Sequence, residues 1–142
     1  MTWNGRRALR RALQVFIGGV LVASALGKGW DLSGFAEVLR TYQAFPSELL
    51  HPLAVTVTVV EIVLGMWVLS GWRLARSALA AAGLNAVYAA WLSISLWRGL
   101  ELANCGCFGV FFPQPLTWLS PAEDLVLVSL CYALSCLARD QT

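Results

Sequence analysis

A stretch between residues 77 and 97 contains no charged side chain, and it constrains the fold more than any other feature of the chain. A helix needs about 20 apolar residues to cross the roughly 30 Å hydrocarbon core of a bilayer. Further apolar stretches lie at 12–27, 52–70 and 102–122. Of the 142 residues, 58% are hydrophobic and 13% are charged, whereas an ordinary soluble protein is about one quarter charged. The sequence therefore predicts a membrane protein and argues against a soluble, disordered or nucleic-acid-binding chain.

These stretches predict an all-α membrane protein, a four-transmembrane-helix bundle formed by a single domain of residues 1–142. The expected helices are at about 9–28, 52–71, 75–98 and 121–139. The apolar part of the first helix is short for a full span, so we expect Arg11 and Lys28 to extend their charged ends towards water. A cleavable signal peptide is the alternative interpretation of this first segment.

Two connecting segments have recognisable patterns. The stretch at 102–122 contains several prolines and cannot form one regular helix, so an apolar loop is expected before the last span. Ser120 and Glu123 form the Ser-x-x-Glu pattern of a capping box, which predicts the start of the last helix. A short amphipathic helix at 32–42 is expected to lie in the membrane interface between the first two spans.

The basic residues are distributed unevenly between the two sides of the expected bundle. Lys and Arg are enriched in cytoplasmic loops. The distribution therefore predicts a multi-pass protein of the inner (cytoplasmic) membrane, with both termini cytoplasmic and the loop at 98–121 on the periplasmic side. The expected cytoplasmic set is Arg6, Arg7, Arg10, Arg11, Arg73, Arg76 and Arg139, and the expected outer set is Lys28, Arg40 and Arg98.

The strongest local signal for chemistry is the pair Cys105 and Cys107 in the expected outer loop. Cysteines two residues apart close a strained disulfide ring, which favours thiol–disulfide exchange and adds little stability because the closed loop is so short. An inert or structural pair and a metal site are the alternatives. A metal site would need more ligands, and the chain offers a single histidine, His51, which we expect to be a solvated residue at a helix start.

The surroundings of the pair contain opposing influences. Arg98 lies shortly before Cys105 and would favour a thiolate through its positive charge. Phe108, Phe111 and Phe112 form an apolar wall that would disfavour charge. These aromatic residues fit either an anchor in the lipid headgroups or a surface for a quinone or a protein partner.

Glu61 lies near the middle of an expected span, where an ionisable residue is costly and is usually turned inward and partnered. Its candidate partners are Lys28, Arg98 and Asn85. Either a polar contact that fixes helix packing or a proton relay would explain Glu61. Small residues at Gly18-Gly19 and Gly65 indicate close helix approach.

Cys131 and Cys136 lie about 140° apart around the last helix, so they cannot pair with each other. Both are expected to be small buried apolar residues near the cytoplasmic end.

Taken together, these residues resemble the MauE/DoxX family over about 11–139, and the MauE branch in particular. The string Cys105-Gly106-Cys107-Phe108-Gly109 after the third span is the most specific element. The resemblance implies a small inner-membrane protein of redox maturation, named for methylamine utilisation, that works with a thioredoxin-like periplasmic protein on a disulfide-rich dehydrogenase subunit. DoxX relatives are linked to quinone-coupled sulfur oxidation. The other residues that carry the resemblance are Lys28, Phe35, Tyr42, Pro46, Glu61, Gly65 and Arg98.

The resulting prediction is a membrane thiol–disulfide relay that acts with a periplasmic thioredoxin-like partner in maturing another protein. The resemblance implies Cys105 and Cys107 as the redox pair, supported by Glu61, Lys28 and Arg98. A quinone is the candidate acceptor, near Phe108, Phe111 and Phe112, and no metal site is expected. The alternatives are a non-enzymatic assembly subunit of a larger membrane redox complex and soft-metal handling by the Cys-Gly-Cys pair.

Overall fold

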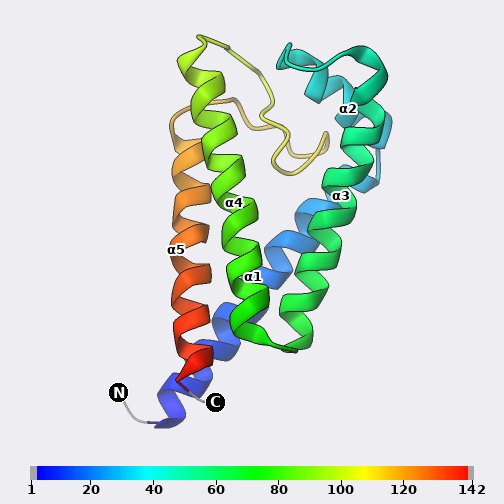
Figure 1. Cartoon of the computed structure of the whole chain (residues 1–142). Coiled ribbons are helices and arrows are strands. Elements are labelled where there is room, and N and C mark those ends of the chain that lie inside the picture. Colours follow the sequence, from blue (N-terminus) through cyan, green and yellow to red (C-terminus); the bar gives the residue numbers. More distant parts are fainter. Residues whose placement is uncertain (1–2, 141–142) are drawn as a thin grey trace.

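The computed structural model describes residues 3–140, and all the regular structure in this part of the chain is helical (Figure 1). Four of its helices are long and apolar enough to cross a membrane, which confirms the expected all-α membrane fold with four spans. The elements are α1 (Trp3–Gly29), α2 (Leu32–Thr41), α3 (Ser47–Ser70), α4 (Leu74–Trp97) and α5 (Leu119–Arg139).

The four long helices form two packed pairs. Helix α1 packs mainly along α3, and α4 packs mainly along α5. The pairs meet near the short α3–α4 turn and diverge towards the other end, where α2 and the segment between α4 and α5 lie (Figure 1). The connection before α5 therefore enters the space between the pairs.

Close packing of α1 on α3 depends on two glycines. A Cβ atom on Gly65 would lie 2.8 Å from Val22 Cγ2, and one on Gly18 would lie 3.1 Å from the Gly65 carbonyl oxygen. These positions confirm the expected close approach of small residues. Gly19 has open space around its Cβ position and takes no part in the contact.

Helix α3 begins five residues before the expected position near Pro52. The prediction followed the apolar stretch alone, whereas Glu48 and His51 are exposed and extend the helix beyond it. A glutamate in the first turn also interacts favourably with the helix dipole. Similarly, α1 begins before the expected residue 9.

The expected capping box of α5 is wrong. The helix begins at Leu119, and no side chain caps its N-terminus. Ser120 is buried inside the first turn, where its hydroxyl lies 3.4 Å from the Thr117 amide and 3.5 Å from the Pro115 carbonyl oxygen. The hydroxyl that was expected to cap the helix thus contacts the backbone of the preceding loop instead.

Helix α2 confirms the expected short amphipathic element. Asp31 caps it by accepting a hydrogen bond from the Gly34 amide at 2.8 Å. Phe35 and Ala36 on its inner face pack with Leu50 and other residues of α3. This contact places α2 over the end of the bundle where the helix pairs diverge.

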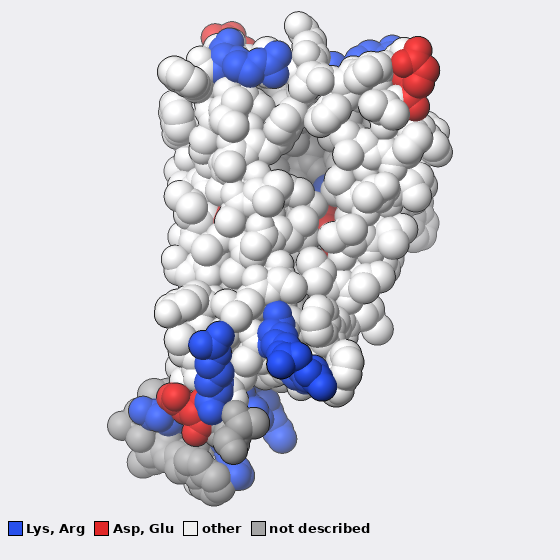
Figure 2. All heavy atoms as spheres, in the orientation of Figure 1, with Lys and Arg blue, Asp and Glu red and all other residues white. Residues whose placement is uncertain are grey.

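Charged side chains lie mainly at the two ends of the molecule, and a belt with few charged side chains separates them on the face that Figure 2 shows. This distribution fits a bilayer around the middle of the bundle. Cys131 is buried as expected. Cys136 is exposed, contrary to expectation, because it lies on the outer face of α5.

Candidate functional site

The segment between α4 and α5 forms a folded loop that presents the cysteine pair. The Cys105 amide donates to the Gln114 carbonyl oxygen at 2.7 Å, and the Leu116 amide donates to the Leu102 carbonyl oxygen at 2.9 Å. Asn104 accepts from the Gly106 amide through its side-chain oxygen at 2.9 Å. These bonds hold Cys105 and its neighbours in one defined turn.

Two glycines of this loop have backbone conformations that other residues rarely adopt. The φ angles are +80° at Gly106 and +77° at Gly109. The backbone of Gly109 lies directly against the carbonyl group of Gly27 in α1, with no room for a Cβ atom. The Cys-Gly-Cys-Phe-Gly string is therefore also the sequence that lets the loop dock on the end of α1.

The sulfur atoms of Cys105 and Cys107 lie 2.6 Å apart. The pKa of Cys105 falls from its ordinary value to about 7, mainly because the Cys107 thiol donates a hydrogen bond to it; burial opposes this shift and the charge of Lys28 supports it. The same hydrogen bond, together with burial, raises the pKa of Cys107. The geometry thus favours a thiolate at Cys105, the nucleophilic form, and a protonated thiol at Cys107.

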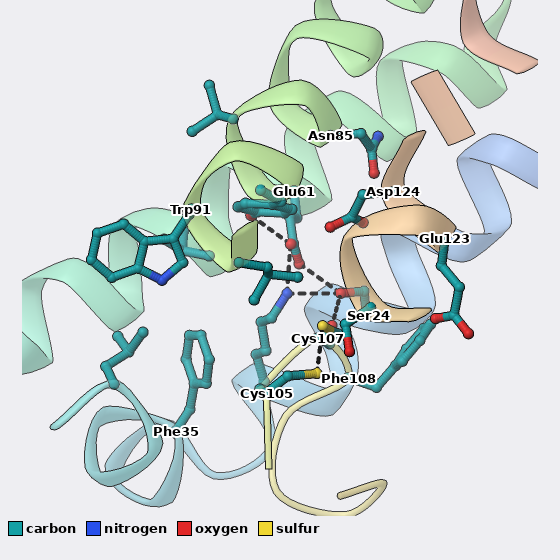
Figure 3. A pocket seen from close by; sticks show the side chains of 18 of the residues that line it. Ser24, Phe35, Glu61, Asn85, Trp91, Cys105, Cys107, Phe108, Glu123 and Asp124 are labelled. Atoms are coloured by element: carbon teal, nitrogen blue, oxygen red, sulfur yellow. Dashed lines mark hydrogen bonds and ion pairs between the residues drawn. The ribbon is translucent and has the colours of Figure 1, made fainter. Parts of the chain in front are cut away.

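A buried polar network lies next to the thiol pair, further inside the bundle (Figure 3). Glu61 Oε1 accepts from Lys28 Nζ at 2.5 Å and from the Tyr88 hydroxyl at 2.6 Å, and Oε2 accepts from the Ser24 hydroxyl at 3.0 Å. The side chains of Lys28 and Glu61 are 4% and 1% exposed, so the expectation that Lys28 extends towards water is wrong, because Glu61 binds its ammonium group inside the bundle. The ammonium group also lies over the Phe35 and Tyr88 rings, at 5.6 and 5.4 Å from their centroids. Both charges are therefore compensated inside the bundle.

Two contacts connect the helices to the backbone of the cysteine loop. Ser24 Oγ lies 2.7 Å from the Cys107 carbonyl oxygen, and its hydroxyl can donate to this oxygen instead of to Glu61. Lys28 Nζ donates to the same hydroxyl at 2.8 Å. The Tyr42 hydroxyl donates to the Cys105 carbonyl oxygen at 2.5 Å. The position of both cysteines is thus set by side chains of α1 and of the end of α2.

Of the three candidate partners of Glu61, the structure selects Lys28. Asn85 donates instead to the Ala81 carbonyl oxygen within α4, at 2.8 Å. Arg98 is exposed and donates to the Tyr42 carbonyl oxygen at 3.0 Å. Lys28 is the cation that lowers the pKa of the Cys105 thiol, whereas Arg98 contacts the backbone of Tyr42, whose hydroxyl binds the Cys105 carbonyl oxygen.

A cavity of about 280 Å³ adjoins the network and the thiols. Figure 2 shows a hollow on this face of the molecule, with charged atoms visible inside it. Phe108 lines the cavity, whereas Phe111 and Phe112 are 56% and 70% exposed. The expected aromatic wall is therefore divided between the cavity and the outer surface. Other residues around the cavity are Val57, Val87, Trp91, Leu92, Cys105, Cys107 and Asp124.

Sequence reasoning missed several members of this site. Tyr88 is a polar residue inside the charge-free stretch, and Ser24 precedes Lys28 by four residues on the same helix face; both signals were available. Asp124 was hidden because a carboxylate near a helix start is ordinarily explained by the helix dipole. Residues 3–140 contain no group of three or more His, Cys, Asp or Glu side chains placed to hold a metal ion.

The fold and site define a small polytopic membrane protein with a cysteine pair docked over a buried ion pair. Residues 6–138 match the family model described as "Methylamine utilisation protein MauE", and the chain belongs to the MauE family. It is 33% identical over 124 residues to methylamine utilization protein MauE of Paracoccus denitrificans, covering 87% of this chain and 67% of that protein. The protein of the same name from Paracoccus versutus is 26% identical over 126 residues, 89% of this chain and 68% of its own length. No solved structure matches the chain.

Proposed function

We propose that this protein is a membrane thiol–disulfide relay in methylamine utilisation, in which Cys105 and Cys107 exchange a disulfide with a thioredoxin-like partner during the maturation of another protein. One observation carries the proposal. Two adjacent thiols of opposite pKa shift lie 2.6 Å apart in a loop that the bundle holds in place. Such a pair has a nucleophile and a resolving thiol, which exchange requires.

The proposal includes a location and a side of the membrane. The α3–α4 turn, with Arg73 and Arg76, lies at one end of the bundle, and the cysteine loop lies at the other (Figure 1). Because basic residues are retained on the cytoplasmic side, the arginine-rich end faces the cytoplasm of the inner membrane. The thiols then face the periplasm, where a thioredoxin-like partner reaches them.

Each polar residue of the site has a role in this proposal. Lys28 supplies positive charge to the Cys105 thiolate, and Glu61 holds the ammonium group in place at 2.5 Å. Arg98 is a positioning residue, because it fixes the Tyr42 backbone while the Tyr42 hydroxyl fixes the Cys105 carbonyl group.

A quinone is the membrane acceptor in this proposal. The cavity is apolar in most of its lining, adjoins both thiols and approaches the volume of small-ligand sites, roughly 300 Å³ and upwards. Phe108 would help to hold the quinone, whereas Phe111 and Phe112 are exposed and do not line the cavity. A quinone would supply a two-electron acceptor from the lipid phase. A water-soluble short-chain quinone should then oxidise the reduced pair to a disulfide, itself becoming the quinol, which blocks alkylation of Cys105 and Cys107 and leaves alkylation of the exposed Cys136 unchanged.

The decisive measurement is the reduction potential of the pair in membranes, by acid quench and differential alkylation. We expect a reversible disulfide with a potential above about −250 mV, in the range of exchange-active proteins. Cys107→Ser should accumulate a mixed disulfide with the partner, and Cys136→Ser serves as the matched control. A pair that never oxidises, or never becomes reduced, would refute the relay.

The exposed aromatic residues around the loop end favour a second candidate, an accessory subunit that packs against a larger membrane redox complex. Trp30, Trp97, Phe112 and Trp118 are between 65% and 87% exposed, and Trp and Phe are enriched in the cores of protein interfaces. This candidate predicts that Cys105→Ser retains full function, which the relay excludes.

A further inference from the structure

We propose that Asp124 is the proton acceptor for Cys107 when the disulfide between Cys105 and Cys107 closes. This inference rests on the proposed exchange function. It assigns the proton-transfer step to α5 rather than to the central carboxylate of the site, Glu61.

The hydrogen bonds of the two carboxylates distinguish their roles. Glu61 Oε1 accepts from Lys28 and Tyr88, and Oε2 lies 3.0 Å from the Ser24 hydroxyl, which can donate either to it or to the Cys107 carbonyl oxygen. A carboxylate with this many donors is a poor base, since a proton would have to displace them. Asp124 Oδ2 is buried and has no hydrogen-bond partner within residues 3–140. The available buried carboxylate oxygen therefore belongs to Asp124.

Asp124 lines the same cavity as both cysteines. In Figure 3 its carboxylate extends from α5 towards the space that the Glu61 network borders, outside the dashed contacts of that network. The negative charge of Asp124 is also one of the causes that raise the pKa of Cys107. A cavity of about 280 Å³ has room for several water molecules, at about 30 Å³ each, which can pass a proton between the two groups.

Every neighbouring element contributes a titratable or charged group to the surroundings of Asp124. The ammonium group of Lys28 forms its ion pair with Glu61, and the carboxylate of Asp124 therefore has no direct counter-ion from Lys28. The neighbouring groups are Lys28 of α1, Tyr42 at the end of α2, Glu61 of α3, Tyr88 of α4, Cys105 and Cys107 of the loop, and Glu123 of α5 itself.

The chemical step is balanced as follows. The Cys105 thiolate attacks a substrate disulfide, forms a mixed disulfide and releases the first substrate sulfur as a thiolate. Cys107 Sγ then attacks Cys105 Sγ, forming the Cys105–Cys107 bond and breaking the mixed disulfide, and the second substrate sulfur leaves as a thiolate. The proton of the Cys107 thiol passes to Asp124. The substrate disulfide is reduced by two electrons, and the cysteine pair is oxidised by two. In the reverse direction, in which electrons pass from a partner dithiol through the pair to the quinone, a partner thiolate attacks Cys105 Sγ, Cys107 leaves and Asp124 returns the proton to it.

The test uses 4,4′-dithiodipyridine with the full chain in detergent, carrying Cys131→Ala and Cys136→Ala so that only the pair reacts. Absorbance follows two releases of thiopyridone, the first from attack by Cys105 and the second from closure by Cys107. We expect Asp124→Asn to slow the second release by roughly a hundredfold, the usual contribution of a general base. The first release should not be slowed, because removal of a nearby negative charge favours the Cys105 thiolate. In Asp124→Asn, the rate of the second release should also keep rising with pH above the pH at which the rate in the parent protein becomes constant.

Two further variants separate a chemical role from a structural one. Asp124→Glu should restore most of the second rate, and Glu101→Gln, which removes an exposed carboxylate of the same loop that does not line the cavity, should leave both releases unchanged. Equal second rates in Asp124→Asn and the parent, or equal slowing of both releases, would overturn the assignment. If the parent itself shows no second release, the proposed exchange function fails instead.

Discussion

Replacing Lys28 by methionine should be among the most destabilising single changes in this protein. The substitution keeps the apolar stem but leaves Glu61, which is 1% exposed, without its counter-ion. Removing one partner of a buried ion pair costs about 3–5 kcal/mol. Glu61 retains the hydroxyl donors of Tyr88 and Ser24, so we expect the lower end, about 3 kcal/mol. This is roughly two powers of ten in the folding equilibrium.

The loss can be measured as the free energy of unfolding in mixed micelles, with circular dichroism following added SDS. The double variant Lys28→Met with Glu61→Gln should recover most of the loss, because it removes the uncompensated charge and keeps a carbonyl acceptor. Arg40→Met breaks an exposed ion pair with Glu37 and is the matched control, with an expected change of at most about 1 kcal/mol. A loss below 1 kcal/mol in Lys28→Met, or a double variant as unstable as the single one, would refute the reasoning.

Three further predictions concern packing, acidity and loop anchoring. Gly65→Ala should destabilise the fold by about 1–3 kcal/mol in the same assay, because its Cβ atom would lie 2.8 Å from Val22 Cγ2. Gly83→Ala is the control and should cause no loss of stability, because the Cβ position of Gly83 has open space around it. Alkylation of Cys105 by iodoacetamide should rise with pH around a midpoint near 7, since the thiolate forms as pH increases through its pKa. Cys107→Ala removes the hydrogen bond that lowers this pKa and should move the midpoint upwards; an unchanged midpoint would contradict this cause. Tyr42→Phe should cost about 0.5–1.5 kcal/mol and speed amide hydrogen exchange in the loop, whereas unchanged exchange would show that the hydroxyl does not anchor it.

The number and type of the spans could be predicted from sequence because hydrophobicity and length determine them. The ends of the helices could not, since a spanning helix continues into water with polar residues such as Glu48, which a search for charge-free stretches discards. The capping-box prediction at Ser120 failed for a different reason. A four-residue pattern carries no information on whether the loop before it already occupies the hydroxyl.

The part of the site that could be predicted from sequence consists of residues whose burial in a membrane costs free energy. A glutamate at membrane depth requires a partner, and Lys28 was among the few that could reach it. Arg98 was placed near the thiols by its distance along the chain, but the loop folds back and brings Cys105 under the influence of Lys28. Long-range proximity of this kind depends on how the helix pairs diverge, which no local pattern encodes.

The ion pair between Lys28 and Glu61 joins the first and third helices, which leave the ribosome at different times. Until α3 has been inserted, the ammonium group has no carboxylate to bind and must stay near the aqueous surface. Once α3 is present, Glu61 can bind this ammonium group at the end of α1, beside the Gly27 carbonyl group on which the Gly109 backbone docks. The cysteine loop is synthesised last of these parts. The contact of Lys28 with the cysteine loop can therefore form only after both α1 and α3 have been synthesised.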